Sequence, residues 1–208
     1  VIPARATVSI NVEAHRPMVR RLKCRNAASF TGAAAEEMRE RYEALTGGGS
    51  RVTFGTFHSI FFRILKLAYR YTADNIVREE QQMQFVRELA QAGGLEPEDE
   101  NEFAASILSE ISSVKGERIA LEHYYSKNCP DAVFRQLYAG YEEKMRRAGL
   151  IDFDDMMVLC LELFTERKDI LSAWQRRYRY ILIDEFQDIN RLQYEIVRML
   201  AKPEDNLF

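Results

Sequence analysis

The chain has 208 residues, 47% of them hydrophobic and 11% aromatic, which is enough to bury a core in one or two domains. Its formal net charge of −3 lacks the global positive excess typical of nucleic-acid-binding chains, so any contact with a nucleic acid would be local. The three cysteines are far apart and include no Cys-x-x-Cys pair, which argues against a disulfide framework or a zinc site. No apolar run approaches the ~20 residues that a membrane-spanning helix needs, and we expect a soluble, cytoplasmic protein.

Most of the chain has apolar residues spaced three and four apart, the pattern of helices that bury one face. The glycine-rich run from Thr46 to Ser50 ends the first of these helices, and Pro130, Asp152 and Asn190 stand where later helices are expected to begin. The helices are predicted over 33–45, 57–68, 75–92, 101–115, 131–148, 152–164 and 190–201.

Strands are predicted in only two places, near 52–54 and at 180–183. The second is a continuous apolar run rich in β-branched residues, which is typical of a strand buried on both faces in a parallel sheet. A long helical block separates the two strands. The sequence therefore predicts an α/β domain with a parallel sheet, interrupted by a helical insertion at roughly 70–147.

The apolar run at 180–183 leads directly into a pair of carboxylates, Asp184 and Glu185. Ligands of α/β sheets bind beyond the carboxyl ends of the strands, which is where these two side chains emerge. At a nucleoside-triphosphate site, one carboxylate can hold Mg²⁺ and the other can orient or deprotonate the attacking water. An exposed Asp-Glu at the start of a loop is the simpler alternative. The apolar run before the pair and Gln187-Asp188 after it favour the phosphate site.

Four segments, in the same order and at similar spacing, resemble motifs of the UvrD/Rep/PcrA helicases of superfamily 1. Ser29–Arg41 is similar to their motif Ia, Gly55–Leu65 to motif Ib, and Leu182–Asp188 to motif II, the Walker B element. Leu150–Met157 resembles the segment by which the helical insertion of these enzymes returns to the motor domain. The resemblance covers residues 29–208.

The resemblance implies a first RecA-like motor domain, interrupted by a helical insertion domain; residues 1–28 ahead of it form an atypical basic segment. It implies a 3′→5′ translocase that uses ATP and Mg²⁺ to move on single-stranded or 3′-tailed duplex DNA, in DNA repair or replication. A second motor domain outside this sequence would supply an arginine finger. The domain boundaries that follow are 29–69 and 148–208 for the motor, 70–147 for the insertion and 1–28 for the basic segment.

The site residues are implied by the motif positions that they occupy. In motif II, Asp184 would hold the metal, Glu185 would act on water, and Gln187 would belong to the same catalytic group. Along the DNA track of the family, hydroxyls and backbone N–H groups hold phosphates, and aromatic rings stack on bases. For the two phenylalanines there, packing in the core is the competing interpretation. The implied DNA-binding residues are Phe30, Thr31, Thr56, Phe57 and His58.

Residues 1–28 depart from the family pattern. The family has a P-loop, Gly-x-x-x-x-Gly-Lys-Ser/Thr, ahead of motif Ia, whereas this sequence has no glycine before Gly32 and no Gly-Lys dipeptide. Residues 1–28 carry six basic residues against one acid, Glu13. We expect a shifted reading frame or a foreign junction there, and a chain that hydrolyses no ATP by itself. Two alternatives remain open: a non-catalytic module that binds DNA or a partner, and the motor part of a helicase–nuclease.

Two groups of charged residues are interpreted as structural. Asp152, Asp154 and Asp155 suit the N-terminal end of a helix, where they favour its dipole, better than a metal site. A group of arginines close to motif II could bind phosphate, but a solvated helix end is the simpler interpretation. This group consists of Arg176, Arg177 and Arg179.

Overall fold

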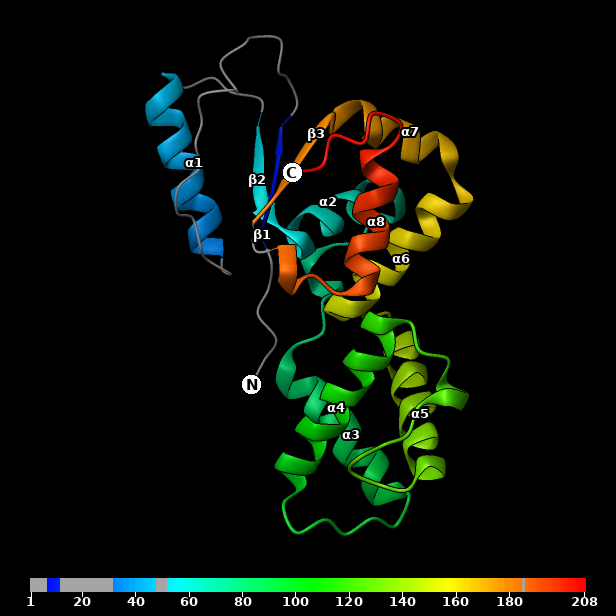
Figure 1. Cartoon of the computed structure of the whole chain (residues 1–208). Coiled ribbons are helices and arrows are strands. Elements are labelled where there is room, and N and C mark those ends of the chain that lie inside the picture. The colour runs from blue at the N-terminus through cyan, green and yellow to red at the C-terminus, as the bar shows by residue number, and fades with distance from the viewer. Residues whose placement is uncertain (1–6, 12–31, 48–51, 185) are drawn as a thin grey trace. The chain divides into compact units, whose positions relative to one another are not determined.

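The computed structural model describes residues 7–11, 32–47, 52–184 and 186–208, and Figure 1 traces their helices and strands. The strands are Thr7–Asn11 (β1), Thr53–Thr56 (β2) and Tyr180–Ile183 (β3). The helices are Gly32–Thr46 (α1), Phe57–Tyr69 (α2), Glu79–Ala92 (α3), Glu100–Glu117 (α4), Asp131–Ala148 (α5), Phe153–Glu166 (α6), Lys168–Arg177 (α7) and Arg191–Ala201 (α8).

The predicted helices are confirmed, and most of their ends differ by no more than a few residues from those predicted. The helix predicted at 131–148 is found at those bounds as α5. The helix predicted at 75–92 begins at Glu79, because Ala73–Asn75 forms a separate 3-10 turn before it. Helix α7 was not among the predicted ranges, although the interpretation of Arg176, Arg177 and Arg179 as a helix end agrees with it. It is short and buries only Leu171 and Trp174, which leaves little periodic pattern in the sequence.

The described residues divide into two compact units. Unit 1 consists of the described residues up to Leu65 and from Leu159 onward, and unit 2 consists of Lys66–Val158. Unit 1 contains the three strands together with α1, α7 and α8, while unit 2 contains α3, α4 and α5. The candidate site residues that the structure describes therefore belong to unit 1.

Strand β1 lies in the middle of a three-stranded sheet with the order β2-β1-β3. It runs antiparallel to both neighbours, with Thr7 opposite Thr56 and Val8 opposite Ile183. Strands β2 and β3 therefore run in the same direction and end at the same end of the sheet (Figure 1). Two predictions were wrong here: strands were expected at only two places, and the sheet was expected to be parallel.

Both errors have a physical reason. A run of four apolar residues indicates a buried strand, but it leaves the direction of the neighbouring strands open, because parallel and antiparallel partners accept the same side chains. The segment of β1 contains only two apolar residues in alternation, Val8 and Ile10, which is too short a pattern to separate a strand from a loop.

A parallel partner does pair with β3, along the edge that faces away from β1. The last residues of the chain run beside it: the N–H of Ile181 donates to the carbonyl of Asn206 at 3.0 Å, and that of Ile183 to the carbonyl of Phe208 at 2.8 Å. The bridge between Ile181 and Leu207 is parallel. β3 thus has an antiparallel neighbour on one side and a parallel one on the other.

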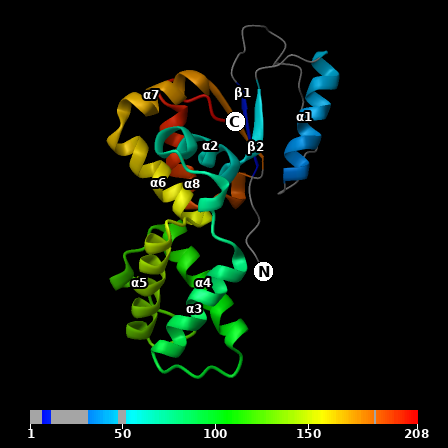
Figure 2. The same cartoon turned by 180° about the vertical axis from the view of Figure 1, so that it is seen from behind.

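The core of unit 1 is formed by the apolar faces of its helices. Helix α1 packs against β2 and β1, and the rings of Tyr42 and Phe54 lie 5.7 Å apart. Helix α7 packs against α8, as the two opposite views in Figures 1 and 2 show. Residues that are buried in this unit include Phe57, Ile60, Phe61, Ile64, Leu65, Cys160, Phe164, Trp174, Tyr178, Leu192, Ile196 and Leu200.

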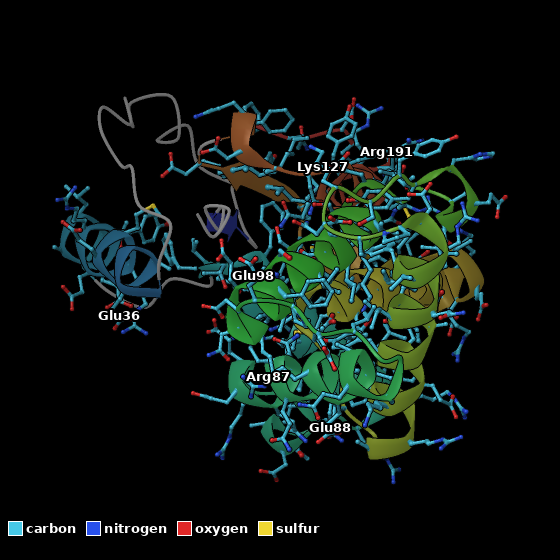
Figure 3. The ribbon with its side chains drawn as sticks, turned by 90° about the horizontal axis from the view of Figure 1, so that it is seen from below. Glu36, Arg87, Glu88, Glu98, Lys127 and Arg191 are labelled. Atoms are coloured by element: carbon cyan, nitrogen blue, oxygen red, sulfur yellow. The ribbon has the colours of Figure 1, made fainter. Side chains whose placement is uncertain are left out.

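Unit 2 is a helical body in which α3 packs against α4 and α5. Gly140 of α5 faces Leu89 of α3 so closely that a Cβ atom at position 140 would lie 2.5 Å from the Leu89 Cδ2 atom. On the outside of the unit, Glu88 of α3 (Figure 3) pairs with Lys144 of α5 at 2.6 Å. The buried core residues are Val77, Val86, Ala104, Ile107, Ile111, Val114, Phe134, Leu137, Tyr141 and Met145.

In the part of the chain that the structure describes, no helix has both the length and the apolar character needed to cross a membrane.

Candidate functional site

Asp184 directly follows the last residue of β3, and its side chain is half-buried. The next residue, Glu185, lies outside the described residues. Phe186–Asp188 then forms a 3-10 turn on which Gln187 is exposed. The strand end therefore places Asp184 where the sequence pattern predicted a ligand-binding carboxylate.

Motif Ib begins at the end of β2 and turns into α2. The backbone N–H of Ser59 donates to Thr56 Oγ1 at 3.2 Å, and Ser59 Oγ donates to the Thr56 carbonyl at 2.8 Å. Thr56 thus fixes the first turn of α2 in the manner of a helix cap. A Cβ atom on Gly55 would approach Ser59 Oγ to 2.5 Å, so a larger residue there would push the Ser59 hydroxyl away from the Thr56 carbonyl.

Phe57 and His58 follow within the first turn of α2. The Phe57 ring is 1% exposed and lies 5.6 Å from the ring of Phe61. A ring in that position cannot stack on a base, so the competing core interpretation holds for the Phe57 side chain. His58 is half-buried. Phe30 and Thr31, the candidates in motif Ia, lie outside the described residues.

The sheet brings motif Ib and motif II to one edge. Thr56 at the end of β2 is paired with Thr7, and Ile183 at the end of β3 is paired with Val8, so Asp184 reaches the level of Thr7 from the other side. With neighbouring strands ~4.8 Å apart, Thr56 and Asp184 are separated by about 10 Å across β1. Residues that are 128 positions apart in sequence are in this way neighbours at the end of one sheet.

The donor chemistry of this edge is compatible with Mg²⁺. Mg²⁺ binds oxygen ligands and commonly uses one or two carboxylates, with water and substrate phosphates completing its shell. The half-buried carboxylate of Asp184, held at a strand end, fits that requirement. Among the described residues there is no group of three or more His, Cys, Asp or Glu side chains that could form an all-protein metal site.

Unit 2 contains an ion cluster that the sequence pattern did not predict. The Lys115 side chain on α4 is only 4% exposed, and its Nζ atom lies 2.9 Å from Asp152 Oδ2, 2.6 Å from Asp155 Oδ1 and 2.7 Å from Glu142 Oε1. It also lies 5.5 Å from the centre of the Tyr141 ring. Burial works against the ammonium, but the three carboxylates outweigh it and raise the pKa of Lys115.

The two aspartates of this cluster also hold the start of α6. The N–H of Asp155 donates to Asp152 Oδ1 at 2.7 Å, and the N–H of Asp152 donates to Asp155 Oδ2 at 3.0 Å. Burial, together with the charge of Asp152, raises the pKa of Asp155 to about 7. The prediction that Asp152 caps a helix is confirmed. The one available signal for Lys115 was that it continues the spacing of Ile107 and Ile111 along the buried face of α4.

Comparison with known proteins agrees with the motifs. Residues 23–208 match the family model described as the UvrD/REP helicase N-terminal domain. A putative ATP-dependent DNA helicase of Bacillus subtilis (strain 168), YjcD, is 38% identical over 192 residues, which is 86% of this chain and 24% of that protein.

The ATP-dependent DNA helicase PcrA of the same organism is 34% identical over 188 residues, covering 87% of this chain and 25% of PcrA. DNA helicase II of Escherichia coli (strain K12) is 35% identical over 185 residues, covering 84% of this chain and 25% of that protein. The chain thus spans about a quarter of the length of these relatives. It belongs to the UvrD/REP helicase N-terminal domain family.

Proposed function

We propose that this chain is part of an ATP-dependent DNA helicase that moves 3′→5′ on single-stranded DNA, in DNA repair or replication. The observation that carries the proposal is the shared sheet edge, where Thr56 of motif Ib and Asp184 of motif II are neighbours across β1. A motor that couples nucleotide hydrolysis to movement needs its DNA contacts and its nucleotide contacts on one rigid element. The names of the similar proteins, all of them DNA helicases, support the same activity.

The catalytic roles are proposed for three residues of motif II. Asp184 holds and orients the metal from the strand end, Glu185 removes a proton from the attacking water or orients it, and Gln187 helps to position that water. When bound, Mg²⁺ offsets the negative charge of the phosphate oxygens. A carboxylate on a strand end suits the first role because the strand backbone limits its movement.

The DNA contacts are proposed at the start of α2 and ahead of α1. Thr56 Oγ1 accepts a hydrogen bond from Ser59, which leaves its own O–H free to donate to a phosphate oxygen. The first backbone N–H groups of α2 favour an anion as well. His58, Phe30 and Thr31 complete the proposed track, on single-stranded or 3′-tailed duplex DNA.

We further propose that unit 1 belongs to the motor domain, expected at 29–69 and 148–208, and that unit 2 belongs to the helical insertion, expected at 70–147. The contents of the two units support this assignment, because the strands lie in unit 1 and α3, α4 and α5 lie in unit 2. The motor part of a helicase–nuclease would have the same two units.

A non-catalytic module is the second candidate function. The observation that favours it is the absence of any Gly-Lys dipeptide, and hence of a P-loop, from the 208 residues. Such a module would keep the DNA track of motifs Ia and Ib and lose turnover. Both candidates predict DNA binding, and only the first predicts ATP hydrolysis by the longer protein.

The DNA track can be tested with the 208-residue chain and a fluorescent single-stranded oligonucleotide. We expect binding that weakens with salt, as phosphate contacts require, and that weakens further in the His58→Ala variant. His123→Ala is the matched control, since His123 is an exposed histidine of unit 2. Equal affinities for the wild type and the His58→Ala variant, with both chains folded by circular dichroism, would remove His58 from the proposed track.

A further inference from the structure

Two segments close to the ends of unit 2, residues 75–77 and 149–151, are hydrogen-bonded to each other. The N–H of Ile151 donates to the carbonyl of Asn75 at 2.8 Å, and the N–H of Val77 donates to the carbonyl of Ile151 at 3.0 Å. The resulting bridge is parallel. We call this pairing of 75–77 with 149–151 the base clamp.

The side chain of Asn75 adds to the base clamp. Its Oδ1 atom accepts the N–H of Thr72 at 2.9 Å, and its Nδ2 atom donates to the carbonyl of Gly149 at 3.0 Å. One side-chain amide thus uses both its acceptor and its donor to join positions that are 74 residues apart in sequence. Loss of this amide would remove contacts on both segments at once.

The base clamp is continuous with the buried interior of unit 2. Val77 and Ile151 are both buried, and Val77 belongs to the core of the unit. Directly after the clamp, Asp152 and Asp155 are held by the ammonium of Lys115. The outgoing segment is therefore fixed to the rest of unit 2 by backbone bonds, by apolar contacts and by an ion cluster.

The core of unit 2 is formed by residues that lie between the two halves of the clamp or next to them. Among the described residues, the buried members of this core run from Val77 to Met145, and the apolar side chains packed against them run from Met83 to Leu150. Unit 2 is also a continuous stretch of chain, Lys66–Val158. A continuous segment that has its own core is the usual form of an independent folding unit.

We propose that the base clamp closes unit 2 into a body that folds and opens by itself, independently of unit 1. Bringing the ends of a long segment together costs conformational entropy. The hydrogen bonds and the buried side chains of the clamp offset that cost within unit 2. Opening of unit 2 then leaves the sheet edge with Thr56 and Asp184 folded, because both residues belong to unit 1. This inference does not rest on the proposed helicase function.

The simpler interpretation is that residues 72–77 form a local turn and that the whole chain unfolds in one step. The single tryptophan allows the two interpretations to be separated in the 208-residue chain. Trp174 lies on α7 in unit 1 and is buried, so its fluorescence in urea follows the unfolding of unit 1. Far-UV circular dichroism follows the helices of both units.

The first test changes the core of one unit at a time. Ile111→Ala removes buried atoms from the core of unit 2 and should lower the urea midpoint of the circular dichroism change of that unit by about 1 M or more. The midpoint of the Trp174 fluorescence should stay unchanged. Leu192→Ala, in the core of unit 1, is the matched control and should lower the fluorescence midpoint.

A fluorescence midpoint that falls together with the circular dichroism midpoint in Ile111→Ala overturns the independence of unit 2. If Ile111→Ala leaves unit 2 unfolded even without urea, the proposal requires that the fluorescence transition persists at the wild-type midpoint. Ile111→Val, which removes a single methyl group, then supplies the smaller shift of the circular dichroism midpoint.

The second test addresses the clamp itself. Asn75→Ala should lower the circular dichroism midpoint of unit 2 by roughly 0.5 M or more and leave the fluorescence midpoint unchanged. Asn75→Asp keeps the acceptor for Thr72 and loses the donor to Gly149, so it should also lower the midpoint, whereas a purely local turn would tolerate it.

Asn101→Ala is the matched control for the clamp, since the exposed Asn101 side chain accepts a hydrogen bond from Arg87 within the same unit. Equal circular dichroism midpoints for Asn75→Ala and Asn101→Ala, or a wild-type midpoint for Asn75→Asp, overturn the role of the clamp.

Discussion

Among single residues, Lys115 has the most unusual electrostatic environment, because its buried ammonium is shared by three carboxylates. Burial and the negative charge of Asp152 together raise the pKa of Asp155 to about 7, well above its usual range. The folded chain therefore holds this proton more tightly than the unfolded chain. The resulting stabilisation is complete below about pH 4 and is lost as the pH rises through about 7.

Replacing Asp155 by Asn should remove this titration. We expect the free energy of unfolding of the wild type, measured relative to the variant, to fall steadily between about pH 4 and about pH 8. Urea unfolding at several pH values measures it. Glu166→Gln, which changes an exposed carboxylate on the same helix, is the control. Its free energy of unfolding should change with pH in the same way as that of the wild type. A pH-independent difference between the wild type and Asp155→Asn would contradict the raised pKa.

Lys115 itself should be indispensable to the stability of unit 2. Lys115→Met leaves three carboxylates without their cation, two of them on α6 and its cap, and removing one partner of a buried ion cluster typically costs ~3–5 kcal/mol. Lys144→Met is the matched control, since the Lys144–Glu88 pair is partly exposed and such pairs contribute about 0–1 kcal/mol. If chemical unfolding shows that the two variants lose similar amounts of unfolding free energy, the buried cluster contributes no more to stability than an exposed ion pair.

Among the elements, the helices could be predicted closely and the sheet could not. Helix α5 follows from Phe134, Leu137, Tyr141 and Met145, whose spacing of three and four places them on one face, all of them buried. Strand β1 pairs with β2, more than 40 residues away, and with β3, more than 160 residues away. No pattern in the local sequence indicates such distant partners. Register and direction are properties of the assembled sheet, which a single short run of residues does not encode.

The contact between α3 and α5 gives a prediction about two elements. Gly140→Ala would push its Cβ atom against Leu89 Cδ2, so we expect a loss of stability from overpacking, ~1–3 kcal/mol, reduced by the higher helix propensity of alanine. In a Leu89→Ala background the clash is absent, and the same change should stabilise the chain by roughly 1 kcal/mol. A double-mutant cycle, with urea unfolding of the four variants, measures whether the effect of Gly140→Ala on the free energy of unfolding changes sign in the Leu89→Ala background. Additive effects of the two substitutions would mean that the helices are not in this close contact.

At the scale of the whole molecule, the motifs made the candidate site predictable in part. Asp184 and Thr56 were predicted as site residues because each occupies a motif position, and the sheet places them at one edge; their roles stay a prediction. The Phe57 ring could not be placed from sequence, because a core position and a base-stacking position require the same aromatic residue. The Lys115 cluster was missed, since α4, α5 and the start of α6 meet only in the folded chain.

The family match begins at residue 23, so most of the basic segment 1–28 lies outside it. The expectation of a shifted reading frame there stays a prediction, which the nucleotide sequence of the parent gene can check. Translation of another frame ahead of codon 29 should restore an apolar strand followed by Gly-x-x-x-x-Gly-Lys-Ser/Thr. If all frames lack that motif, a motor that has lost its P-loop becomes the better explanation.

The last prediction concerns turnover by the 208 residues as they stand. The triphosphate needs a cradle of backbone N–H groups and a lysine from the P-loop, and the sequence has no Gly-Lys dipeptide to supply them. In the proposed mechanism, Asp184 and Glu185 act on a nucleotide that is already positioned, so they would not replace that cradle. We therefore expect phosphate release from ATP with single-stranded DNA and Mg²⁺ to be no faster than in the Glu185→Gln variant, in which a positioned base worth ~10²–10⁴ in rate has been removed. DNA-stimulated release that exceeds this control would show that another part of the chain binds the phosphates, and would favour the catalytic over the non-catalytic function.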